Sequence, residues 1–506
     1  IAGTDKTFLN TRMILPPAGE YVLTTVMQLG TDWPDAGGKL PGLANTGQAL
    51  NTGGRPMVID GVSCSNAGWG GRPANGCRWS ARTGFRGRSG EQAGLDVSGL
   101  GGVIEVDPIA QTAEVQGMCT YEDLVDATLP HGLMPFVVPQ LKTITLGGAV
   151  TGLGIEATSW RNGLPHESVL EMDVLTGSGE VVTAGPEGEH ADLFHAFPNS
   201  YGSLGYATRL HIELEAVPPR VALRHLRFDD AQSAAEAVER LVAAGEHDGE
   251  RIDGLDGVAF APDEIYLTLA RWTDEPGETS DYTGQQIYYR SVRERTSDLL
   301  TMHDYLWRWD TDWFWCSRAF GTQNPKIRRF WPKKYRRSSF YWKLIGLDQK
   351  YDIADRLEAR KGNPPRERVV QDIEVPVEHT ADFVEWFLRE IPIEPIWLCP
   401  LRLREPGIDA ERRWPLYPLQ PKRTYVNVGF WSSVPIVPGQ REGAANRLIE
   451  EKVSELDGHK SLYSDAYYSE DEFDVLYGGT HYAALKAKYD PTSRLLDLYA
   501  KAVRRK

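Results

Sequence analysis

Two stretches of this chain repeat the same order of predicted elements, and the repeat limits the fold more than any other feature. Residues 220–275 predict a strand, a helix at 231–244 and two further strands, with Gly245 placed to end the helix. The second stretch covers 367–460 and predicts strands at 369–377, 395–404 and 425–431 and helices at 380–390 and 444–456. Two such units predict one antiparallel sheet with helices on one face.

A region of mixed helix and strand precedes this repeat, at residues 95–217. Residues 103–106 and 113–116 predict a hairpin. Thr120 is followed three positions later by Asp123, which resembles a capping box and predicts a helix that stops near Gly132. Further strands are expected at 170–175, 180–183 and 207–214.

Residues 1–82 form a separate leader that is rich in Gly, Asn and Pro and carries short strand-like runs. Its stretches 37–43 and 75–82 resemble the front of a jelly-roll polysaccharide lyase. About 80 residues are too few to close such a sandwich. The leader is therefore either a β-rich extension or junction of uncertain origin, or part of a carbohydrate-active module.

The segment 139–157 carries the richest set of motif residues, with four glycines and three threonines around a predicted turn. Glycine lets backbone N–H groups approach a pyrophosphate closely. Gly152, Gly154 and Ala157 also satisfy the spacing G-x-G-x-x-A, although no apolar-periodic helix follows, as a dinucleotide fingerprint requires. Spacing alone leaves two interpretations, a phosphate loop or a structural turn.

A second turn rich in Gly and hydroxyl residues lies at 198–206. The two glycine-rich segments, with the 170–183 hairpin between them, resemble the flavin-binding domain of the vanillyl-alcohol oxidase superfamily. Residues 369–372, 395–400 and 462–467 further resemble the Diminuto-type delta-24-sterol reductases and their actinobacterial relatives that reduce methylene-bearing fatty acyl chains. The resemblance covers about residues 95–506.

The resemblance implies an α+β protein: a PCMH-type FAD-binding domain at 83–218, then an α+β cap domain with an antiparallel sheet at 219–506, with an aromatic and basic insertion at 300–365. It implies noncovalent FAD and NADPH as the electron donor. The family's first phosphate loop should lie near 82–88, where the match is poor. The cofactor-binding residues it implies are Thr145, Gly147, Gly148, Gly152, Gly154, Ile155, Val182, Ser203 and Gly205.

The implied reaction is reduction of a C=C bond in a lipid, which requires a hydride at one carbon and a proton at the other. Reduced flavin supplies the hydride, so the protein must supply a proton donor beside an apolar slot. A neutral tyrosine hydroxyl suits this role. The candidates are Tyr463, Tyr467 and His481, with Tyr468 and Tyr482 nearby; each is alternatively a packed side chain with a satisfied polar group.

Residues 326–343 combine eight Lys and Arg with interleaved aromatics and contain no Asp or Glu. This mixture fits contact with an anionic membrane surface, a solvated face with packed aromatics or, least well, stacking on RNA. Just upstream, Trp307, Trp309, Trp313, Phe314 and Trp315 are expected either to line a lipid slot or to form ordinary core.

Composition excludes several other classes of protein. The net charge of −15 disfavours a general nucleic-acid binder. Five scattered cysteines give neither a disulfide framework nor metal-ligand spacing, so no metal is expected. No signal pattern or apolar run of about 18 residues appears, so we expect a cytoplasmic protein, peripheral at most. The rivals are a flavin oxidase using O₂ and a carbohydrate lyase or binding module.

Overall fold

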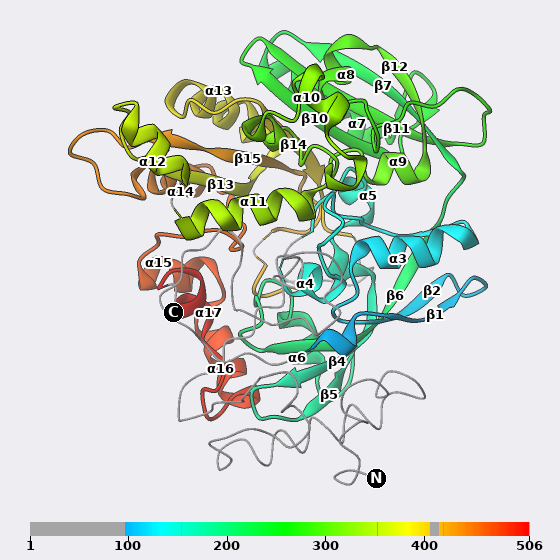
Figure 1. Cartoon of the computed structure of the whole chain (residues 1–506). Coiled ribbons are helices and arrows are strands. Elements are labelled where there is room, and N and C mark those ends of the chain that lie inside the picture. Colours follow the sequence, from blue (N-terminus) through cyan, green and yellow to red (C-terminus); the bar gives the residue numbers. More distant parts are fainter. Residues whose placement is uncertain (1–96, 153, 352, 405–413, 418, 505–506) are drawn as a thin grey trace.

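The computed structural model describes residues 97–504, except 153, 352, 405–413 and 418 (Figure 1). Within these residues, a six-stranded and an eight-stranded sheet dominate, and every pairing between their strands is antiparallel. The predicted α+β class with an antiparallel cap sheet is thereby confirmed. The leader, and with it the expected first phosphate loop, lies outside the described residues.

The six-stranded sheet has the order β1-β2-β6-β4-β5, with β3 also paired to β6. Both predicted hairpins form, as β1–β2 and β4–β5. The Thr120 hydroxyl accepts a hydrogen bond from the Asp123 amide and caps α3, as the sequence predicts. The elements are β1 (Val103–Asp107), β2 (Thr112–Gln116), α3 (Tyr121–Thr128), β3 (Leu133–Pro135), α4 (Leu146–Thr151), α5 (Ser159–Asn162), β4 (Val169–Thr176), β5 (Val181–Ala184), α6 (Ala191–Ala196) and β6 (Gly205–Ala216).

The eight-stranded sheet joins the two repeated units in the order β12-β7-β11-β10-β14-β15-β13-β16. Helix α7 spans the predicted residues, with Asp230 as its cap and Gly245 in the left-handed conformation at its end. The repeat comprises β7 (Arg220–Phe228), α7 (Ala231–Ala244), β10 (Gly254–Ala261), β11 (Glu264–Thr273), β13 (Arg366–Pro376), α13 (Thr380–Glu390), β14 (Ile396–Leu401), β15 (Tyr425–Pro435), α14 (Ala444–Glu455) and β16 (His459–Lys460), and the small hairpin β8 (Glu246–His247) and β9 (Glu250–Arg251) follows α7.

Both faces of the larger sheet are covered, as β14 shows. All six of its residues are buried, and they alternate between two cores. Ile396 and Leu398 face the core that contains residues of α7, α13 and α14, so these helices lie on one face, as predicted. Trp397 and Cys399 face the opposite core. Burial on both sides explains why this strand is apolar throughout.

The opposite face of the larger sheet is covered by the insertion between the two repeats. Trp307, Trp309 and Trp315 are each at most 1% exposed and belong to the same core as Trp397. They are therefore interior packing residues. The chain between the two repeats contains α8 (Tyr288–Glu294) and β12 (Ser297–Thr301), followed within the 300–365 insertion by α9 (Met302–Leu306), α10 (Pro325–Phe330), α11 (Ser338–Tyr351) and α12 (Ile353–Arg360).

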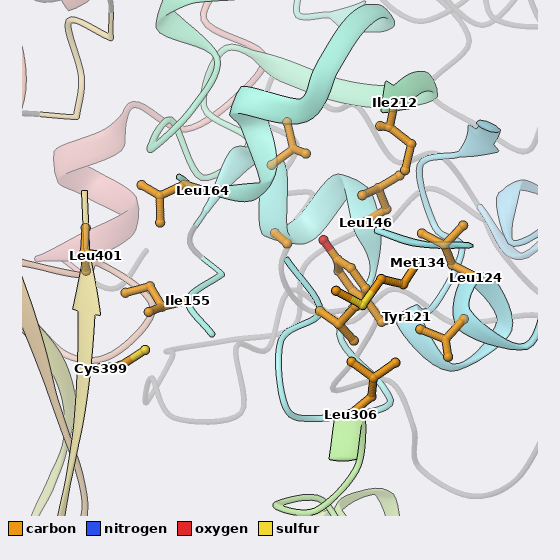
Figure 2. Close-up of a cluster of buried hydrophobic side chains, with 14 of the residues drawn as sticks. Tyr121, Leu124, Met134, Leu146, Ile155, Leu164, Ile212, Leu306, Cys399 and Leu401 are labelled. Atoms are coloured by element: carbon orange, nitrogen blue, oxygen red, sulfur yellow. The ribbon is translucent and has the colours of Figure 1, made fainter. Parts of the chain in front are cut away.

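One apolar core runs from the smaller sheet into the larger one. Figure 2 shows Leu146 and Ile155 of the glycine-rich segment in the same cluster as Leu306 of α9 and Leu401 of β14. The chain also returns to the smaller sheet at its C-terminal end, where Ser178 donates its amide to the Tyr489 carbonyl at 3.0 Å. This last segment contains α15 (Glu470–Leu476), α16 (Gly479–Tyr489) and α17 (Leu498–Ala502) (Figure 1).

Candidate functional site

The glycine-rich segment is a short buried helix, α4, where the sequence suggested an open loop. Thr145 is its cap and accepts a hydrogen bond from the Gly148 amide at 3.2 Å. The two preceding amides, of Leu146 and Gly147, donate to the carbonyls of Cys119 and Gly117 at 2.9 and 2.8 Å. Protein acceptors therefore engage the first three amides of this helix. In this arrangement a phosphate would have to compete with those protein acceptors for the three amides.

Packing accounts for three of the predicted glycines. A Cβ on Gly147 would lie 2.5 Å from the Gly117 carbonyl oxygen, and one on Gly154 would lie 2.8 Å from the rings of Pro139 and Pro165. At Gly205, where φ is +158°, a Cβ would meet Val174 of β4 at 2.6 Å. These positions exclude side chains because other segments of the protein press against them. Packing within the protein therefore explains the absence of a side chain at these three residues.

The second glycine-rich turn lies directly against the first. The Tyr201 amide donates to the Thr151 carbonyl at the end of α4, at 2.9 Å. Asn199 and Tyr201 both adopt positive φ, of 64° and 48°, so the turn is tightly wound. The fold thus assembles the two segments in one place. Ser203 is buried in the same turn, and Val182 lies on β5, the strand beside β4.

The chemistry of this assembled region suits a cofactor with a pyrophosphate. The segments 139–157 and 197–208 contain a single carboxylate, Glu156, and it pairs with Arg308 at 2.6 Å. Two lysines from the C-terminal helices contact the second turn: Lys486 donates to the Ser203 carbonyl at 2.7 Å, and Lys501 donates to the Tyr201 carbonyl. The residues present therefore fit FAD in charge.

The larger sheet is tied to the same turn through the segment after β16. The Leu462 amide donates to the Tyr201 hydroxyl at 2.9 Å. Nearby, His459 shares a hydrogen bond of 2.8 Å with the buried Glu374 of β13. These contacts place the 462–467 motif at the junction of the flavin-binding sheet and the cap sheet.

Tyr463 is the predicted donor that this junction holds most firmly. Its hydroxyl donates to Asp372 Oδ2 at 2.9 Å and accepts a hydrogen bond from the Trp431 indole at 3.1 Å. Asn427 donates to the other oxygen of Asp372 at 2.8 Å. Burial raises the pKa of Asp372 to about 7, against the opposing effect of the Asn427 and Tyr463 hydrogen bonds. The Tyr463 phenol is therefore hydrogen-bonded to a carboxyl group, that of Asp372, whose pKa lies close to neutral pH.

The other two predicted donors lie elsewhere. Tyr467 is packed against the helix α14 region: its amide donates to Glu450 at 3.1 Å, and a Cβ on Gly443 would lie 2.3 Å from its ring. His481 is exposed on α16. The structure does not bring these three side chains into one constellation. The roles of Tyr467 and His481 remain sequence predictions.

Sequence reasoning missed a buried ion network that begins near the end of the glycine-rich segment, at Glu156. Arg308, fully buried between Trp307 and Trp309, donates to Glu156 at 2.6 Å and to Asp256 at 3.0 Å. Burial raises the pKa of Glu156, and the Arg308 guanidinium opposes that shift. The network ties the flavin-binding region to the cap sheet. The sequence did contain a signal for this network, because Arg308 is a charged residue between two tryptophans, Trp307 and Trp309, and a charge in such a position is expected to be buried and paired.

Comparisons with known proteins agree with this arrangement. Residues 77–185 match the FAD binding domain family. The chain is 24% identical to a Delta(24)-sterol reductase of Arabidopsis thaliana, over 81% of this chain and 76% of that protein. It is 25% identical to the Homo sapiens Delta(24)-sterol reductase over 79% and 75% of the two chains. Cytokinin dehydrogenase 6 of Oryza sativa subsp. japonica is 35% identical over 26% of this chain and 25% of its own.

The matches support a flavin-dependent redox enzyme over the rival of a carbohydrate lyase, which depended on the leader. They also agree with the order of the elements, since the family match extends through α3, α4 and the β4–β5 hairpin. The chain is therefore an FAD-dependent oxidoreductase with a PCMH-type FAD-binding domain, in the branch of the vanillyl-alcohol oxidase superfamily that is related to the Delta(24)-sterol reductases.

Proposed function

We propose that this enzyme reduces a C=C bond in a lipid, either a sterol side chain or a methylene-branched fatty acyl chain. The observation that carries the proposal is the position of Tyr463, which is held between Asp372 and Trp431 beside the turn at 199–201. The activity for which the sterol reductase relatives are named supports the same class of substrate.

The proposed cofactor is noncovalent FAD, and the residues proposed to hold it are those implied by the resemblance: Thr145, Gly147, Gly148, Gly152, Gly154, Ile155, Val182, Ser203 and Gly205. Packing at Gly147, Gly154 and Gly205 assigns these three an indirect role, because they let the surrounding main chain come close together. No His or Cys occurs within 139–157 to form a covalent link. When bound, the reduced flavin supplies a hydride, and NADPH is the proposed source of its electrons.

Tyr463 is the proposed proton donor to the second alkene carbon. When Asp372 is protonated, its Oδ2–H can donate to the phenol oxygen, which also accepts from Trp431 Nε1–H. The phenol proton is then free to point toward the alkene. As it leaves, both donors stabilise the negative charge that develops on the phenol oxygen, and the Asp372 proton replaces the one lost.

Trp431 is the proposed contact for the lipid. Unlike the interior Trp307 and Trp309, Trp431 is only half-buried, and its ring lies 4.3 Å from that of Phe314. An aromatic surface beside the donor keeps water away from the alkene and strengthens the electrostatic effect of Asp372. Only the partly exposed edge of the aromatic layer is assigned to substrate; its interior is core.

Isotope labelling tests this function directly. Purified protein with bound flavin is given a sterol or fatty acyl alkene and NADPH deuterated at C4 in H₂O, or unlabelled NADPH in D₂O. We expect one deuterium at one former alkene carbon in the first case, and at the adjacent carbon in the second. Rapid reoxidation of the flavin by air with peroxide release and no labelled product would establish the oxidase rival. A protein that takes up no FAD would overturn the proposal.

A further inference from the structure

The segment 313–347 contains no Asp or Glu, although the chain as a whole carries a net charge of −15. Seven of its nine Lys and Arg residues fall into two groups in the structure. Arg328 is buried and pairs with Asp312 at 2.7 Å, and Arg336 donates to the Gly284 carbonyl at 2.8 Å. Arg337 pairs with Glu122 of α3. These three arginines hold the segment against the protein, so they are structural.

The second group points outward. Lys326, Arg329, Lys333 and Lys334 are all exposed on α10 and the turn that follows it. Side chains with large apolar surfaces alternate with them: Phe330 is 81% exposed, Ile327 43% and Tyr335 36%. We call these seven residues the α10 patch. Because the inward arginines fix its backbone, the patch is ordered before any partner arrives.

This combination distinguishes the α10 patch from the exposed apolar residue of α15. Val475 of α15 is 83% exposed, but Glu470, Asp471, Glu472 and Asp474 surround it in sequence. Such single exposed side chains are ordinary. Lysines interleaved with an exposed Phe and Tyr match a bilayer interface, where cations meet anionic headgroups and aromatic rings lie at headgroup depth.

We propose that the α10 patch docks this protein onto the surface of a bilayer that contains anionic phospholipids. The contact is peripheral: within the described part of the chain, no helix is both long and apolar enough to cross a membrane. Electrostatic attraction of the exposed cations brings the protein to the surface, and Phe330 and Ile327 enter the headgroup region. This inference is independent of the proposed reaction.

Vesicle sedimentation of the full-length protein tests it. Vesicles of phosphatidylcholine with phosphatidylglycerol should bind the protein, whereas pure phosphatidylcholine should not. At about 1 kcal/mol per lysine, and 1.4 kcal/mol per tenfold change, Lys333→Gln with Lys334→Gln should weaken binding about 30-fold. Phe330→Ser should weaken binding even at high salt, where the lysine contribution is screened.

Two matched variants serve as controls. Lys422→Gln with Arg441→Gln removes the same charge from exposed positions outside the patch, and Val475→Ser removes an equally exposed apolar side chain. Both should bind as the unmodified protein does, with unchanged thermal unfolding in all variants. The proposal is overturned if the patch variants bind like their controls, if pure phosphatidylcholine binds equally well, or if vesicles do not bind while a single-stranded oligonucleotide does.

Discussion

Replacing Tyr463 by Phe removes one oxygen atom and tests the proton donor most directly. A positioned general acid contributes about 10²- to 10⁴-fold to a rate, so we expect a loss of that size in lipid reduction. The change also removes the partner of the Trp431 indole and one partner of Asp372, whose bonds to the phenol are 3.1 and 2.9 Å long. Leaving a partly buried polar group without a partner costs about 1–3 kcal/mol of stability.

Anaerobic stopped-flow absorbance separates the two halves of the reaction. Bleaching of the flavin by NADPH needs no protein proton donor at the alkene, so its rate should be unchanged in Tyr463→Phe. Return of the flavin colour on addition of lipid should slow by the full factor.

Tyr477→Phe is the matched control, because the buried Tyr477 hydroxyl donates to the Lys460 carbonyl at 2.8 Å and its removal costs comparable stability without removing a hydrogen bond of Tyr463 or Asp372. It should leave both rates nearly unchanged. A Tyr463→Phe enzyme that reduces lipid within about threefold of the unmodified rate would refute the assignment of Tyr463 as donor. Equal slowing of both halves would refute it as well, since that result indicates damage to the flavin site.

Three further predictions follow from the same structure. Because the pKa of Asp372 is raised to about 7, the rate of lipid reduction should fall as the pH rises above about 7, and Asp372→Asn should lack this decline. The same raised pKa means that the folded protein binds a proton that the unfolded chain does not, so thermal unfolding should show the unmodified protein gaining stability relative to Asp372→Asn as the pH falls from 7 toward 4. Arg308→Ala should destabilise the protein by about 3–5 kcal/mol because it leaves Glu156 and Asp256 buried without their cation. Arg423→Ala, which removes a half-buried cation from two exposed carboxylates, should cost about 1 kcal/mol or less in the same denaturant titration. Overpacking in Gly147→Ala should cost about 1–3 kcal/mol of stability and should therefore lower both the melting temperature and the flavin occupancy. Gly185→Ala, whose added Cβ would have its nearest neighbour 3.8 Å away, should change neither.

The glycine-rich segment shows how far sequence reasoning reaches in this protein. Spacing identified 139–157 as special but left two explanations for its glycines, a phosphate loop or a turn. At Gly147 the immediate explanation is the carbonyl of Gly117, 30 residues earlier, which no local pattern reveals. The FAD-binding domain that the resemblance implied is shown by the family match. Which of these glycines contacts FAD is still a proposal.

The basic segment 326–343 is a second case in which the sequence identified a feature but could not predict its contacts. The sequence presents Arg328 and Lys333 as equivalent members of one cationic run. The fold buries Arg328 against Asp312 and leaves Lys333 in solvent. Charge counting therefore predicted a basic surface, but it could not say which cations belong to it.

Local chemistry determined much of the architecture by itself. Asp230 and Gly245 set the ends of α7, Thr120 caps α3, and alternating apolar residues define β6, because caps and periodicity act within a few residues of chain. Only the tertiary structure decided which side chains meet. Tyr463 and Asp372 are 91 residues apart, and pairing of β16 with β13 is what brings their segments together. Their contact, and the pKa that burial gives Asp372, depend on long-range strand pairing, which no local pattern encodes.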